Sequence, residues 1–160
     1  MPGARILLVE DDEVLCELIL RNLEIRGHDV HVAENARTAL AHLRTTAFDL
    51  IILDICLPDQ TGWEVLRTAQ KEGRLSPIQL NGQAGQLPVV VLSAVRVSPG
   101  RLQEFHPLAY LPKPFPMEAI LRLAAEAASR RNGEIVSEEI DDGETGSSHI
   151  TSPYEEDLYA

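Results

Sequence analysis

The chain has few cysteines and no cluster of cysteine or histidine side chains. Its two cysteines, Cys16 and Cys56, lie far apart in separate apolar segments. A disulfide-stabilised scaffold or a structural zinc site needs such ligands close together, and the five histidines are scattered as well. The spacing therefore argues against both kinds of site and predicts ordinary surface or turn histidines.

Long apolar runs and aromatic residues are also scarce. No apolar stretch approaches the ~20 residues that cross a membrane, and the start of the chain, MPGARILLVEDD, lacks the order of a signal peptide. Only 4% of the residues are aromatic against 44% hydrophobic, which favours an aliphatic α/β protein over a β-sandwich. These features predict a cytoplasmic protein with no membrane partner.

Basic residues are fewer than acidic ones, and the excess of acids is distributed unevenly along the chain. The formal net charge is −11, and residues 132–160 hold nine acids and no lysine or arginine. Residues 1–131 carry 16 acids against 14 bases, so neither part offers the basic face that direct nucleic-acid binding requires. We therefore expect one domain over 3–131 and a disordered acidic tail over 132–160. The alternative for the tail is a segment that folds on a partner through Ile150, Tyr154, Leu158 and Tyr159.

Apolar segments alternate between two periodicities along the domain. Short runs rich in Val, Ile and Leu predict buried strands, and runs with apolar residues three and four apart predict helices. The expected strands are 5–9, 28–33, 50–53, 88–93 and 108–111, and the expected helices cover about 14–26, 36–46, 63–72, 99–105 and 117–131. This order predicts an α/β protein with a five-stranded parallel sheet, order 2-1-3-4-5, and helices on both faces, a flavodoxin-like doubly wound fold.

Polar side chains follow four of these strands. Glu10 and Asp11 follow the first strand, Asp54 the third, Ser93 the fourth and Lys113 the fifth. Because the carboxyl ends of parallel strands meet at one edge, these side chains should converge. Three close carboxylates need a cation among them, and oxygen ligands favour Mg²⁺. The set therefore indicates an aspartyl phosphate site with Asp54 as nucleophile.

Each of these residues has an ordinary structural role as an alternative. Glu10 and Asp11 could be a helix-capping pair, Ser93 could be a strand-end hydroxyl bonded to backbone, and Lys113 could be exposed to solvent. Four strand ends with reactive groups on the same edge favour the functional interpretation over coincidence.

The four signatures ILLVEDD, FDLIILDICLP, PVVVLSA and YLPKPF stand in that order over residues 3–131. Together they resemble the receiver domain of two-component response regulators. The resemblance implies that Asp54 is the phosphoacceptor and Asp11 a Mg²⁺ ligand. It also implies that Glu10 meets the metal through water and that the carbonyl of Cys56 is a further ligand.

The same resemblance implies that Ser93 and Lys113 hold the phosphoryl group and that the Lys113–Pro114 bond is cis. Ser93 and Tyr110 would form the switch, with Tyr110 turning inward after phosphorylation. The partners implied are a histidine kinase or histidine phosphotransfer protein and a downstream protein target; a homodimer is also compatible. The chain would then be a stand-alone phosphoacceptor without a separate substrate, and so not an enzyme.

Two departures from the family's pattern concern the output surface. Residues 73–87 form an insertion before the fourth strand, and the interval from Ser93 to Tyr110 is short, which predicts a stunted fourth helix. They keep open a second hypothesis, an adaptor with the receiver fold whose binding ignores phosphorylation. A haloacid-type hydrolase would need a D-x-D motif after the first strand, and a dinucleotide enzyme a glycine turn there. Neither motif is present.

Overall fold

The computed structural model describes residues 2–75 and 86–133. Five parallel strands form one sheet in the order β2-β1-β3-β4-β5, as predicted. The strands are β1 (Arg5–Val9), β2 (Asp29–Ala33), β3 (Leu50–Asp54), β4 (Val89–Ser93) and β5 (Ala109–Pro112). The helices are α1 (Glu13–Ile25), α2 (Ala36–Thr45), α3 (Gly62–Lys71), α4 (Pro99–Phe105) and α5 (Met117–Arg131).

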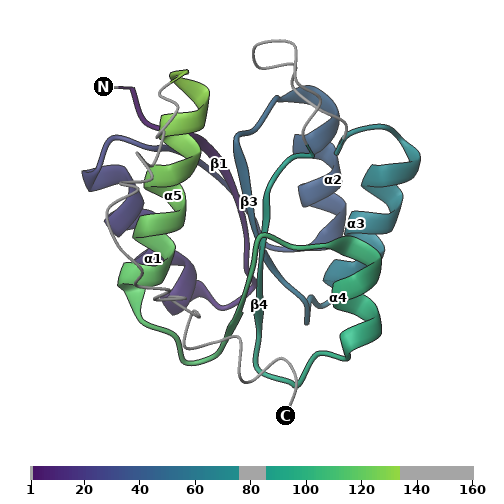
Figure 1. The fold of residues 1–160 in the computed structure, drawn as a ribbon. Coiled ribbons are helices and arrows are strands. Elements are labelled where there is room, and N and C mark those ends of the chain that lie inside the picture. The colour runs from purple at the N-terminus through teal and green to yellow at the C-terminus, as the bar shows by residue number, and fades with distance from the viewer. Residues whose placement is uncertain (1, 76–85, 134–160) are drawn as a thin grey trace, which may run out of the picture.

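The sheet separates two hydrophobic cores. Helices α1 and α5 cover one face, and α2, α3 and α4 cover the other (Figure 1). Successive residues of a strand point to opposite faces. In β1, accordingly, Ile6 and Leu8 enter the core under α1 and α5, whereas Leu7 and Val9 enter the other. All five residues of β3 are buried, because this central strand is covered on both sides.

Local signals in the sequence fix the ends of several helices. The Asp12 carboxylate accepts hydrogen bonds from the backbone N–H groups of Val14 and Leu15, and Asn35 accepts one from Thr38. Both residues therefore cap a helix N-terminus. After α1 the chain passes through Gly27 at φ 85°, a left-handed conformation that favours glycine.

Helix α4 is short, as predicted, and an aromatic stack holds it against α3. The rings of Trp63 and Phe105 lie 5.4 Å apart at an interplanar angle of 19°. The Arg67 guanidinium lies 5.8 Å from the centre of the Phe105 ring and also pairs with Glu104 at 2.9 Å. The C-terminal end of α4 is therefore fixed to the face of α3 by stacking and charge together.

Two predictions fall largely outside the described residues: most of the insertion over 73–87 and nearly all of the acidic tail over 132–160. Within the described ranges, no helix has both the length and the apolar character needed to cross a membrane.

Candidate functional site

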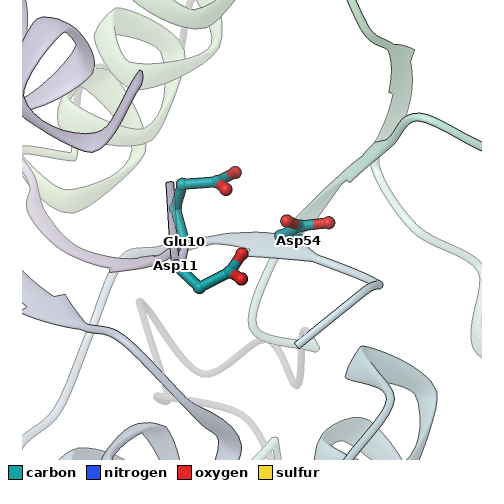
Figure 2. A group of neighbouring side chains, drawn as sticks. All are labelled: Glu10, Asp11 and Asp54. Atoms are coloured by element: carbon teal, nitrogen blue, oxygen red, sulfur yellow. The ribbon is translucent and has the colours of Figure 1, made fainter. Parts of the chain in front are cut away.

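The site lies at the carboxyl edge of the sheet, where β1 and β3 end side by side. Val9 pairs with Leu53, so the residues that follow, Glu10 and Asp54, leave neighbouring strands at the same level. Figure 2 shows the side chains of Glu10, Asp11 and Asp54 gathered at this edge. The strand pairing therefore brings together the three acids that the sequence analysis singled out.

The three carboxylates form a compact cluster. One oxygen from each lies within 4.8 Å of the others, with Glu10 and Asp54 buried and Asp11 exposed. Burial raises the pKa of Glu10 to about 7, and the nearby charge of Asp54 adds to that rise against the lowering effect of Lys113 and the Asp12 amide. Hard oxygen donors at this spacing, open to solvent on the side of Asp11, fit a Mg²⁺ ion that keeps several of its waters.

Lys113 supplies the positive charge inside this cluster. Its Nζ donates to Glu10 Oε2 at 2.9 Å and to Asp54 Oδ2 at 3.1 Å, with 21% of the side chain exposed. Burial alone would lower the pKa of Lys113, but the hydrogen bonds to the two carboxylates raise it above its ordinary value. The lysine is therefore charged and held between two acids from different strands.

The loop after β3 orients the Asp54 carboxylate. The backbone N–H of Cys56 donates to Asp54 Oδ1 at 3.0 Å, and Cys56 also forms a β-bridge with Thr61. The N–H of Gly62 donates to the Ile55 carbonyl at 2.8 Å and closes the loop. A Cβ atom at Gly62 would lie 2.7 Å from the Asp54 carbonyl oxygen, so the start of α3 packs directly on the backbone of the site.

Ser93 and Tyr110 meet at a single backbone carbonyl. The Ser93 hydroxyl donates to the Val95 carbonyl at 2.7 Å and accepts from the Val95 N–H at 3.1 Å. The Tyr110 hydroxyl donates to the same carbonyl at 3.1 Å, and its side chain is buried. The inward position that we expected after phosphorylation is the one Tyr110 holds in this structure.

Ser93 and Lys113 are joined through the backbone at the same edge. The Lys113 N–H donates to the Ser93 carbonyl at 2.8 Å, and the Lys113–Pro114 bond is cis. The Ser93 hydroxyl bonds the backbone of Val95, which was the structural alternative for this residue, while Lys113 does not extend into solvent.

Asp59 is a residue of this region that the sequence did not single out. Its carboxylate accepts hydrogen bonds from the N–H groups of Ala36 and Arg37, more than twenty residues earlier in the chain. A turn-forming Leu-Pro-Asp sequence carries no signal for a partner so distant, and only the packing of α2 beside the loop shows it.

Comparison with known proteins gives the family. A sequence model described as the response regulator receiver domain matches residues 6–125. The response regulator MprA of Mycolicibacterium vanbaalenii is 34% identical over 119 residues, which cover 73% of this chain and 47% of MprA. The chain thus spans about half the length of this curated relative.

Solved structures agree with this assignment. The receiver domain of the Francisella response regulator 1452 has a TM-score of 0.67 at 23% identity, covers 81% of this chain and 99% of its own, and supports the fold. The response regulator TrrA of Thermotoga maritima, solved in complex with Mg(2+)-BeF, has a TM-score of 0.62 at 25% identity and covers 79% and 99%. Together with the family match over most of the chain, these findings place the protein in the response regulator receiver family of two-component systems.

Proposed function

We propose that this chain is a phosphorylation switch whose phosphoacceptor is Asp54. The proposal depends on one observation, the set of charged groups that surround the Asp54 carboxylate. The Lys113 ammonium lies 3.1 Å from Oδ2, and oxygens of Glu10 and Asp11 lie within 4.8 Å. A carboxylate must approach a phosphoryl group that is itself negative. The fixed ammonium supplies part of the positive charge which that approach requires, and a metal ion held by the three acids would supply the rest.

The acidic cluster suits Mg²⁺ with a particular division of roles. Glu10 already bonds Lys113 through Oε2 and the Asp12 N–H through Oε1. Glu10 would therefore act through water, leaving Asp11 and Asp54 as direct carboxylate ligands and the Cys56 carbonyl as a further one. When bound, Mg²⁺ would neutralise charge on the phosphoryl oxygens.

The proposed step is transfer from a phosphohistidine. A carboxylate oxygen of Asp54 attacks the phosphorus, the P–O bond forms as the P–N bond breaks, and the electron pair of that bond stays on the imidazole of the donor. Lys113 would hold one phosphoryl oxygen by its charge, and the Ser93 hydroxyl would donate to another. The donor would be a histidine kinase or a histidine phosphotransfer protein.

The signal would leave the site through the Val95 carbonyl. Ser93 must give up its bond to Val95 in order to donate to a phosphoryl oxygen, and Tyr110 shares that acceptor. A hydrogen bond to a charged group contributes about 1.5–3 kcal/mol, whereas a nearly complete population shift needs about 5.5 kcal/mol. We therefore expect a downstream protein partner to complete the switch.

Acetyl phosphate with Mg²⁺, followed by mass spectrometry of the modified peptide, tests the proposal. We expect one phosphoryl group on Asp54, none in Asp54→Asn, and strongly reduced labelling in Asp11→Asn. Labelling of another residue in the wild-type protein, or labelling that ignores chelation of the metal, would contradict it.

The short, stacked α4 supports a second candidate, an adaptor whose binding ignores phosphorylation. Helix α4 has seven residues, and the Trp63–Phe105 stack fixes its end to α3, which would restrict movement of this surface. Partner binding separates the two functions: an adaptor binds equally well as wild type and as Asp54→Asn, whereas a switch loses its regulation.

A further inference from the structure

Asp59 joins the loop after the phosphoacceptor to the start of a different helix. Its Oδ1 accepts from the N–H groups of Ala36 at 2.9 Å and Gln60 at 3.0 Å, and its Oδ2 accepts from the N–H of Arg37 at 3.1 Å. Ala36 and Arg37 are the first two residues of α2. The hydrogen bond to Ala36 is the largest cause of a lowered pKa of Asp59, so the side chain is ionised at neutral pH.

The start of α2 takes its hydrogen-bond acceptors from two different segments. The first N–H groups of a helix have no partner inside the helix, and a negative charge there is favourable. Asn35 accepts from the third of these groups, that of Thr38, at 2.8 Å, while Asp59 accepts from the first two. One carboxylate thereby fixes the end of α2 and the tip of the loop relative to each other.

The base of the same loop sets the geometry of the site. The Cys56 N–H holds Asp54 Oδ1, and the bond from the Gly62 N–H to the Ile55 carbonyl closes the loop. Movement of the loop tip would tilt the peptide groups around Cys56, which orient the Asp54 carboxylate and carry the carbonyl expected to bind Mg²⁺. Substitution of an outer group that orients a metal ligand in this way commonly weakens metal binding.

We propose that Asp59 is a positioning residue for the phosphoacceptor site: it anchors the loop over 55–61 on α2 and so holds the Asp54 carboxylate and the Cys56 carbonyl in place for the metal. The proposal rests on the proposed function of the site. Asp59 itself is exposed at the outer edge of the loop and is not assigned contact with the phosphoryl group.

The test compares two ways of removing a cap from the same helix. Asp59→Ala removes the acceptor of two N–H groups of α2 and of the Gln60 N–H, and so releases the loop, whereas Asn35→Ala removes the acceptor of Thr38 and leaves the loop untouched. Two measurements are made on each full-length variant: Mg²⁺ affinity by calorimetry, and hydrogen exchange of the Gly62 amide in the metal-free protein. For Asp59→Ala we expect about tenfold weaker Mg²⁺ binding, the lower end for outer groups of a metal site, and loss of Gly62 protection. Asn35→Ala should change neither.

Two further variants separate anchoring from simple loss of charge. Asp59→Asn keeps one acceptor oxygen and should fall between wild type and Asp59→Ala. Glu34→Gln removes one exposed charge just before α2 and should leave Mg²⁺ affinity unchanged.

Two outcomes would overturn the anchoring role of Asp59. Equal effects of Asp59→Ala and Asn35→Ala would show that Asp59 only stabilises α2. Equal loss of affinity in Glu34→Gln would assign the effect to charge alone. If the wild-type chain binds no Mg²⁺ while the contrast in Gly62 exchange persists, the metal site fails and the anchoring of the loop by Asp59 stands.

Discussion

The hydroxyl groups of Ser93 and Tyr110 donate to the same acceptor, the carbonyl oxygen of Val95, at 2.7 and 3.1 Å. The two residues stand 17 positions apart in the sequence, and they come from β4 and β5. Because two donors share one oxygen, a change in the position of either hydroxyl alters the hydrogen bond of the other. The Val95 carbonyl is therefore a direct physical link between the candidate phosphoryl site and the buried aromatic ring.

The shared acceptor predicts that substitutions at the two positions are not additive. Tyr110→Phe removes one donor and should lower the free energy of unfolding by about 1 kcal/mol. In a double-mutant cycle with Ser93→Ala, measured by urea denaturation, we expect a coupling of at least about 0.5 kcal/mol. Purely additive losses would mean that the Val95 carbonyl accepts the two bonds independently.

Replacing Lys113 should weaken the fold and strengthen metal binding. Lys113→Met leaves the buried Glu10 and Asp54 carboxylates without a cation, and breaking such a pair costs up to about 3–5 kcal/mol. The 21% exposure of the lysine places the expected loss toward the lower end. With the competing ammonium gone, Mg²⁺ should bind more tightly and restore part of the stability.

Thermal denaturation with and without Mg²⁺ measures both effects. Lys71→Met is the matched control, because Lys71 is an exposed lysine at the end of α3. A Lys113→Met protein that gains no more stability from Mg²⁺ than wild type would show that the ammonium and the metal do not compete for these acids.

Gly62→Ala should disturb the site from the side of α3. The new Cβ would lie 2.7 Å from the Asp54 carbonyl oxygen and 3.0 Å from the Ile55 Cα, both rigid backbone atoms. We expect a loss of about 1–3 kcal/mol in the free energy of unfolding, as for other overpacked sites, and weaker Mg²⁺ binding. Gly100→Ala is the control, since a Cβ there meets no atom within 4 Å. Equal behaviour of the two variants would contradict this close packing.

His28 should make the fold sensitive to mild acid. Its Nδ1 accepts from the Ala4 N–H at 3.0 Å, and burial, followed by the charge of Arg26, lowers its pKa from 6.5. The folded state therefore binds fewer protons than the unfolded state just below that pH. The stability that uncharged His28 contributes is complete above pH 6.5 and is lost as the pH falls through the lower pKa of the folded state.

Urea denaturation from pH 7.5 to 5 should show this loss of unfolding free energy in the wild-type protein. The loss should be absent in His28→Asn, which keeps an acceptor oxygen and cannot titrate. Glu10 shifts in the opposite direction, since its raised pKa favours the protonated folded state as the pH falls. The difference between the two proteins removes that contribution. A difference that does not change with pH would assign His28 a purely structural role.

The sequence determined the alternation of strands and helices, the order of the sheet and the edge at which the polar residues meet. These features depend on apolar periodicity, on caps such as Asp12 and Asn35, and on the rule that parallel strands end at one edge, all of which are local or topological. The convergence of Asp11, Asp54 and Lys113 followed from them without knowledge of any side-chain contact.

Only the tertiary structure decided which groups pair across that edge. The bonds of Lys113 to Glu10 and Asp54, the sharing of the Val95 carbonyl and the burial of His28 join residues from distant segments. So does the anchoring of α2 by Asp59. Such contacts depend on side-chain directions and on the packing of neighbouring elements, for which the sequence near each residue holds no signal. The sequence determines which chemical groups lie at the carboxyl edge of the sheet, and the packing of neighbouring elements determines which partner each group contacts.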